Sequence, residues 1–253
     1  MKPELIVENL SYAIGGRSIL KDLSFTLGTG ECVALLGANG AGKTTLLRIL
    51  LRLQASGGGN ILLRGKPLAV FPQRELARAI AYVPQSHTPP FPYRVKDIVM
   101  MGRLAQVPFG ARRPKSDWHF VEQALETLAI RHLAEQPYDQ ISGGERQAAL
   151  IARALAQEAR ILILDEPETG LDFGQQQRLF GILQRLSDEG YAVLATTHDP
   201  FRARQVYQRA VLLHQGRVMA DGPVQHVLTD AAIRRLYKLG PAQSPGSLRA
   251  VGA

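Results

Sequence analysis

The sequence lacks several features that mark particular classes of protein. It has one cysteine, Cys32, which excludes an internal disulfide and suits a reducing compartment. No apolar run approaches the roughly 18 residues needed to cross a bilayer. The first ten residues, MKPELIVENL, lack the charged-then-apolar pattern of a signal peptide. We therefore expect neither a disulfide-rich secreted fold nor an integral membrane protein.

Basic residues outnumber acidic ones, but the excess is dispersed. The net charge is +8, yet the densest cluster is only Arg112, Arg113 and Lys115. No basic run alternates with aromatic residues as in single-strand binders. The sequence also contains no internal repeat and no coiled-coil heptads. Charge alone favours work near anionic surfaces, and we expect no nucleic-acid partner.

The most informative stretch is residues 31–48, ECVALLGANGAGKTTLLR. An apolar run of strand length leads into a glycine-rich turn, and Lys43 begins a helical pattern, which matches G-x-x-x-x-G-K-[ST] in its proper context. Such a turn offers backbone N–H groups to a polyphosphate, while Lys43 reaches the phosphates and Thr44 takes Mg²⁺. We prefer this to a glycine-rich turn with a solvated lysine. The residues expected to bind ATP here are Gly37, Ala38, Asn39, Gly40, Ala41, Gly42, Lys43, Thr44 and Thr45.

Strands and helices alternate along the chain, which favours a mainly parallel α/β sheet. Ligands collect at the carboxyl ends of such strands. Four expected strand ends carry polar chemistry: residues 37–44, Gln85, Asp165 with Glu166, and His198. We expect these groups to converge on one site.

These residue types suit ATP hydrolysis. Asp165 is the expected Mg²⁺-side carboxylate, and Gln85 would complete the Mg²⁺ shell or place the water. Glu166 is expected to be the general base, a role worth roughly 10²–10⁴-fold in rate. His198 would contact the γ-phosphate and hold Glu166 in line, a reading we favour over a structural histidine.

Local patterns predict further elements. We expect a central helix that runs to about residue 53, a helix over residues 72–79, irregular connectors at residues 86–92 and 108–114, and a hairpin turning at residues 215–216. Ser116 is expected to cap an amphipathic helix that carries His132 on its apolar stripe. Ser142 and Glu145 have the spacing of a capping box.

Together these residues resemble the ATP-binding subunit of an ABC transporter, over nearly the whole chain. Residues 141–147, ISGGERQ, resemble the family signature; residues 171–172 resemble the D-loop, Gln85 the Q-loop and His198 the switch histidine. The resemblance implies an α/β fold: a P-loop NTPase core, an N-terminal antiparallel β subdomain and a helical signature subdomain at about residues 86–158. The ATPase domain would span residues 1–240, with residues 241–253 as a loose tail.

The resemblance also implies partners. Two copies would pair head to tail, with each ATP between residues 37–44 of one chain and Ser142, Gly143 and Gly144 of the other. A capping role for Ser142 is compatible, because a glycine-rich helix start offers N–H groups to phosphate. The pore would be a separate transmembrane permease, served by an external substrate-binding protein. The subunit would be peripheral at the cytoplasmic face of the cell membrane.

Two positions depart from the family pattern. The aromatic residue that stacks on adenine aligns with Ile14, and Tyr12 lies two residues earlier. Either Tyr12 stacks or Ile14 gives apolar contact only. Glu168 stands where Thr is common and is expected to add a negative charge near the site.

Residues 83–103, VPQSHTPPFPYRVKDIVMMGR, resemble importers of metal chelates: iron–siderophore, haem, cobalamin and, close by, molybdate or tungstate. Manganese and zinc importers share part of this text. An exporter subunit with a separate pore is the alternative. A soluble ABC-type ATPase acting on nucleic acid is disfavoured, because the chain has one ATPase unit and no coiled coil. A nucleotide sensor without turnover is disfavoured by Glu166 beside Asp165.

Overall fold

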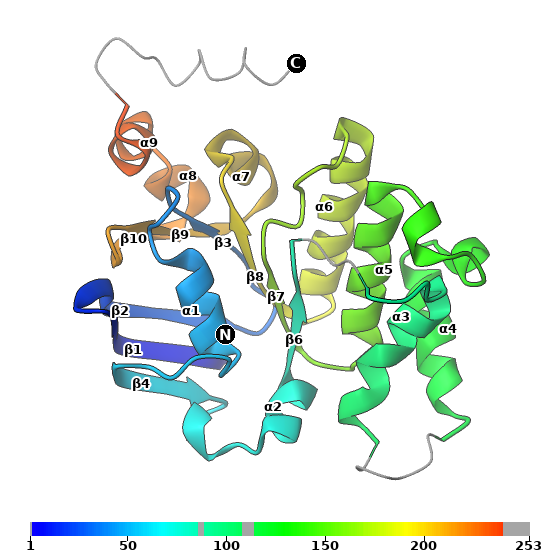
Figure 1. Cartoon of the computed structure of the whole chain (residues 1–253). Coiled ribbons are helices and arrows are strands. Elements are labelled where there is room, and N and C mark those ends of the chain that lie inside the picture. Colours follow the sequence, from blue (N-terminus) through cyan, green and yellow to red (C-terminus); the bar gives the residue numbers. More distant parts are fainter. Residues whose placement is uncertain (1, 86–88, 108–113, 240–253) are drawn as a thin grey trace.

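A computed structural model describes residues 2–85, 89–107 and 114–239 (Figure 1). Within them, a six-stranded sheet lies at the centre. Its order is β10 (Arg217–Pro223), β9 (Arg209–His214), β3 (Cys32–Leu36), β8 (Ala192–Thr197), β7 (Ile161–Leu164) and β6 (Ile80–Val83). All neighbours are parallel except β10, which returns from β9 through the expected turn at Gln215 and Gly216. The mainly parallel sheet is confirmed, so β3, β6, β7 and β8 end at one edge.

A second, antiparallel sheet packs beside the first. Its order is β2 (Arg17–Gly28), β1 (Pro3–Ile14), β4 (Gly58–Leu63) and β5 (Lys66–Pro67). Its apolar face shares one core with β3 and with α1 (Lys43–Leu50). Leu10, Leu23 and Leu46 are fully buried there, and each such side chain contributes about 1.5–3 kcal/mol. This core fixes the helix that follows the glycine-rich turn.

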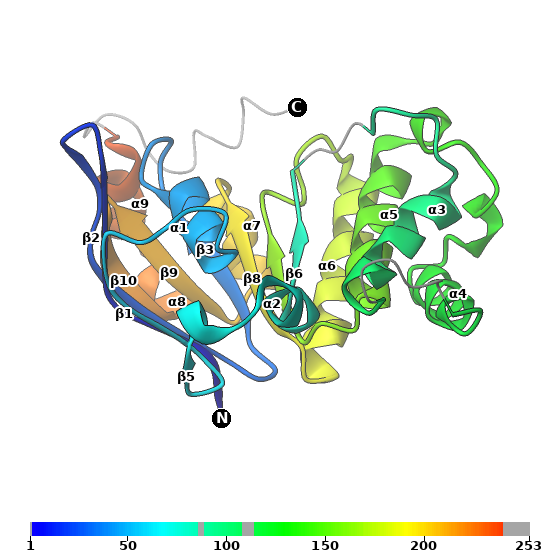
Figure 2. The same cartoon turned by 60° about the horizontal axis from the view of Figure 1, so that its bottom comes forward.

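Helices gather on the opposite side of the central sheet, where Figures 1 and 2 show them in green. They are α3 (Val95–Met100), η2 (Met101–Ala105), α4 (Asp117–Thr127), η3 (Arg131–Leu133), η4 (Tyr138–Gln140) and α5 (Gly143–Ala156). Their apolar faces form one cluster with the other face of the central sheet. The predicted helical subdomain therefore exists, while its exact residue limits stay a prediction.

A charged pair, Arg103 and Asp117, is buried in this helical region. Arg103 is 4% exposed and donates to Asp117 at 3.1 Å and to the Ala156 carbonyl at 2.8 Å. It also pairs with Glu158 at 2.6 Å, and its guanidinium lies 3.9 Å from the ring centroid of Phe120. Arg103 thus ties η2, α4 and the carboxyl end of α5 together.

The remaining described elements flank the central sheet. They are η1 (Leu68–Val70), α2 (Gln73–Ala79), α6 (Phe173–Asp188), α7 (Pro200–Val206), α8 (Val224–Val227) and α9 (Asp230–Tyr237). In Figure 1, α7 and α9 lie at the top of the view. None of the helices in the described ranges is long and apolar enough to span a bilayer.

Three local predictions differ from the structure. The helix α1 ends at Leu50 rather than near residue 53, because Arg52 turns to a left-handed φ of 53°. Ser116 makes no side-chain cap bond, since its backbone is already helical whereas an N-cap needs an extended one. His132 lies in η3, outside α4. Parts of the two expected connectors, and the tail at 241–253, fall outside the described residues.

Candidate nucleotide site

The glycine-rich turn joins β3 to α1 in a conformation that requires glycine. Gly42 is the N-cap of α1 at φ 109°, and a Cβ there would come within 2.6 Å of the Leu20 side chain. A Cβ on Gly37 would lie 2.6 Å from the Leu213 carbonyl oxygen. The chain therefore turns tightly at the amino end of α1, where the helix dipole favours an anion.

The Lys43 side chain folds back into the glycine-rich turn. Its side chain is buried, and its ammonium donates to the Gly37 carbonyl at 2.6 Å. Burial lowers the pKa of Lys43, while the carboxylates of Glu166 and Asp165 raise it. Thr44, the next residue of α1, is exposed at the helix start. The loop thus holds a cation and a hydroxyl where a triphosphate would bind.

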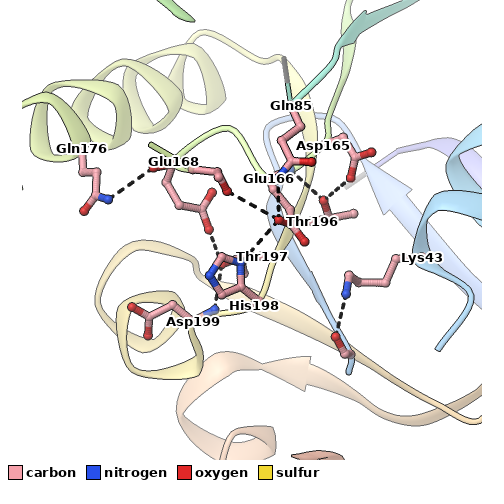
Figure 3. A network of polar contacts seen from close by, with 12 residues as sticks. Lys43, Gln85, Asp165, Glu166, Glu168, Gln176, Thr196, Thr197, His198 and Asp199 are labelled. Carbon is pink, nitrogen blue, oxygen red and sulfur yellow. Dashed lines mark hydrogen bonds and ion pairs between the residues drawn. The ribbon is translucent and has the colours of Figure 1, made fainter. Parts of the chain in front are cut away.

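A buried threonine holds the Asp165 carboxylate and the Glu166 backbone at the end of β7. The Thr196 hydroxyl donates to Asp165 at 2.7 Å and accepts from the Glu166 backbone N–H at 2.8 Å (Figure 3). Glu166 has a left-handed φ of 45°, which costs a non-glycine residue about 1–3 kcal/mol. Thr196 stabilises this conformation and so aims the Glu166 side chain. Sequence reasoning assigned Thr196 only to a strand.

Three predicted residues meet at the Glu166 carboxylate. The Gln85 amide donates to Glu166 Oε2 at 3.0 Å, and His198 Nδ1 lies 3.5 Å from the same oxygen (Figure 3). These side chains come from the ends of three adjacent strands, β6, β7 and β8. The strand-end prediction of a convergent site therefore holds in the geometry.

Beside this group is an open cleft of about 980 Å³. Gly37, Ala38 and Asn39 line it together with Glu166 and His198. The cleft thus runs from the start of the phosphate loop to Glu166 and His198, whereas Lys43, Thr44, Gln85 and Asp165 are not among the residues that line it.

Tyr12 and the signature residues Ser142, Gly143 and Gly144 do not line this cleft. Tyr12 lines a separate hollow with Gly57 and Arg217, so the structure does not bring Tyr12 to this cleft. Ser142 is not among the cleft residues; it caps α5, accepting from the Glu145 N–H at 3.3 Å while its own N–H donates to Glu145 at 2.8 Å. The capping box is confirmed. The roles of Tyr12 and Ser142 toward nucleotide stay predictions.

Glu168 differs from the expectation of a charge displayed near the site. It is 5% exposed and accepts from the Thr197 hydroxyl behind the cleft (Figure 3). Burial raises the pKa of Glu168, which favours its neutral form. Its backbone carbonyl also accepts from Gln176 at 3.2 Å. Glu168 therefore binds the end of β8 to the start of α6 from inside the protein.

The candidate metal ligands suit a magnesium ion that is also bound by the phosphates of the nucleotide. Thr44, Gln85 and Asp165 offer a hydroxyl, an amide and a carboxylate, the hard oxygen donors that Mg²⁺ prefers. The described residues contain no cluster of three His, Cys, Asp or Glu side chains that could hold a metal alone. Such a donor set fits an ion that shares phosphate oxygens with its substrate.

A phosphate loop between strand and helix, with an acidic pair at a nearby strand end, defines a P-loop nucleoside triphosphatase. The sequence model of the ABC transporter family matches residues 20–169, and the chain belongs to this family. It is thus an ATPase of the ABC class.

Curated relatives cover almost the whole chain. A hemin import ATP-binding protein, HmuV of Bordetella pertussis, is 40% identical over 92% of this chain and 91% of its own length. The ferric enterobactin transport ATP-binding protein FepC of Escherichia coli is 36% identical over 92% of this chain and 86% of its own length. A solved metal-chelate type ABC transporter in an inward-facing conformation superposes with a TM-score of 0.82 at 33% identity, covering 92% of this chain and 88% of that one.

Proposed function

We propose that this chain is the ATP-hydrolysing subunit of an importer of metal chelates. The observation that carries the hydrolytic part is the meeting of Gln85 and His198 on the Glu166 carboxylate beside the phosphate loop. The relatives that transport hemin and ferric enterobactin support the cargo class. An iron–siderophore, haem or cobalamin is the proposed cargo, with molybdate or tungstate as the alternative cargo of the same class.

In this proposal each site residue has a separate role in the hydrolysis of the triphosphate. Lys43 exchanges the Gly37 carbonyl for phosphate oxygens, and the N–H groups of residues 37–45 bind the remaining charge. Glu166 takes a proton from the attacking water. Gln85 either helps to place this water or completes the Mg²⁺ shell. His198 contacts the γ-phosphate and keeps the Glu166 carboxylate in line. Mg²⁺ held by Thr44, Gln85 and Asp165 would supply charge neutralisation at the phosphates.

We also propose how the subunit assembles. Two copies pair head to tail, so that Ser142, Gly143 and Gly144 of one copy approach the phosphate loop of the other. The amino end of α5 suits this role, because its dipole and backbone N–H groups favour the γ-phosphate. We further propose a separate permease at the cytoplasmic face of the membrane and an external substrate-binding protein.

The test replaces the proposed base without changing its shape. Glu166→Gln should bind ATP normally, form a nucleotide-dependent dimer and lose about 10²–10⁴-fold in hydrolysis rate. Glu189→Gln, on the exposed end of α6, is the control and should hydrolyse ATP like the unmodified protein. Undiminished hydrolysis by Glu166→Gln would remove the assignment of the base.

The cargo is tested in vesicles that contain the subunit together with a candidate permease. ATP is supplied on the side of the membrane that carries the ATPase subunit, and the binding protein and the cargo on the other side. ATP should then drive transport of an iron–siderophore, haem or cobalamin toward the side of the subunit. Manganese and molybdate are the comparison cargoes. Transport in the outward direction would instead support the exporter alternative.

A further inference from the structure

The last helix of the described chain touches the backbone of His198. Tyr237 ends α9, and its hydroxyl donates to the His198 carbonyl oxygen at 2.9 Å. Tyr237 also lines the same cleft as Gly37, Glu166 and His198. Burial, followed by the nearby carboxylates of Asp199 and Glu166, raises the pKa of Tyr237 well above its usual value. The hydroxyl therefore keeps its proton and remains a donor at neutral pH.

The helix that carries Tyr237 is firmly anchored. Ile233 and Leu236 are fully buried in the main core, and the Thr229 hydroxyl caps α9 by accepting from Ala232 N–H at 3.2 Å. Arg204 of α7 donates to the Leu228 carbonyl and to Asp230, the latter at 3.0 Å. This pair of contacts joins α7, which directly follows His198, to the start of α9. Tyr237 thus acts from a rigid support.

The position of the His198 imidazole depends strongly on its backbone. The side chain is 56% exposed and lies 3.5 Å from Glu166 Oε2. On one side, Thr197 is bound to Glu168 through its hydroxyl. On the other, Asp199 accepts from the N–H groups of residues 201 and 202, at 3.0 Å each, and so caps α7. The carbonyl between these two fixed residues is the atom that Tyr237 holds.

We propose that Tyr237 is a positioning residue for ATP hydrolysis, which holds the His198 carbonyl so that the imidazole stays within reach of Glu166 and the γ-phosphate. This inference rests on the proposed role of His198. Its consequence is that α9, far from the phosphate loop in sequence, belongs to the hydrolytic machinery.

The first experiment removes only the hydroxyl. Tyr237→Phe should lower kcat for ATP hydrolysis about three- to tenfold, the effect of one net hydrogen bond, while KM for ATP stays nearly unchanged and the melting temperature falls by no more than a few degrees. Tyr207→Phe is the matched control: its buried hydroxyl has no hydrogen-bond partner among the described residues, and its kcat should not change. An unchanged kcat in Tyr237→Phe would overturn the proposal, as would a fall matched by loss of folded protein.

The second experiment asks whether Tyr237 acts through His198. In a His198→Ala background, measured under single-turnover conditions, adding Tyr237→Phe should cause no further loss. The same fold-loss in both backgrounds would refute a role through His198. If His198→Ala alone hydrolysed ATP at the unmodified rate, the proposed role of His198 would fail, and this outcome is distinct from a silent Tyr237→Phe beside an impaired His198→Ala.

Discussion

Replacing Arg103 should destabilise the protein through a buried carboxylate. Asp117 is 4% exposed; its Oδ1 accepts from Arg103, and its Oδ2 has no hydrogen-bond partner among the described residues. Arg103→Met keeps an unbranched apolar stem but removes the guanidinium whose charge compensates Asp117. Glu158 matters less, because its side chain is 49% exposed and water can replace the lost partner.

The size of the effect follows from this burial. Breaking a buried pair by removing one partner costs about 3–5 kcal/mol. Native proteins have only about 5–15 kcal/mol of stability in total, so a large part would be lost. For a chain of this length each kcal/mol lowers Tm by about 2–4 °C, which predicts a fall of roughly 6–20 °C. Thermal denaturation followed by circular dichroism measures it.

Two further variants isolate the cause. Arg103→Met with Asp117→Leu should recover part of the lost stability, because an apolar pair replaces an uncompensated buried charge. Arg131→Met is the control: Arg131 pairs with Glu122 at 2.8 Å through the same Nε atom, but both side chains are exposed, and Tm should not change. A Tm for Arg103→Met equal to that of the unmodified protein, or no recovery in the double variant, would refute the reasoning.

Three other substitutions test the site. Lys43→Ala should weaken nucleotide binding because it removes the cation of the phosphate loop; titration with a fluorescent ATP analogue measures this, and an unchanged affinity would contradict it. Ser142→Arg should abolish hydrolysis while the monomer still binds ATP, since the arginine would block the proposed dimer contact; loss of binding in the monomer would favour a purely structural cap. Glu168→Gln tests the buried carboxyl through pH. Because burial raises the pKa of Glu168, the folded protein holds this proton to higher pH than the unfolded chain, so the associated stability is present below the unfolded pKa and is lost as pH rises through the folded pKa. The unmodified protein should therefore lose stability relative to Glu168→Gln as pH rises from about 4, the usual range for a carboxyl; denaturation midpoints with parallel pH profiles would disprove this.

Features set by a few neighbouring residues were predictable from the sequence. The phosphate loop depends on glycines at fixed spacing between a strand and a helix, and the structure has that arrangement. The capping box of Ser142 and Glu145 needs only residues three apart. The convergence of Gln85, Glu166 and His198 followed from one rule, that parallel strands end at the same edge.

Apart from that convergence at the strand ends, contacts between distant segments were not predictable. Thr196 meets Asp165 from 31 positions away, and Tyr237 meets His198 from 39 positions away. Both contacts exist only because of strand order and helix packing, and a threonine in a strand or a tyrosine in a helix carries no local sign of them. Ser116 is a case where a local sign was misleading: serine is a common capping residue, but its backbone here is already helical and its side chain makes no cap bond.

The strand order has a consequence for how tolerant this enzyme is to change. The strands that present Gln85, Glu166, His198 and the phosphate loop are immediate neighbours in the sheet, in the order β6, β7, β8, β3. The distance between neighbouring strands, about 4.8 Å, is set by main-chain hydrogen bonds and depends little on the identity of the surrounding side chains. Substitutions in the flanking helices can therefore change the melting temperature or the choice of partner. The strand spacing that separates the reacting groups stays the same.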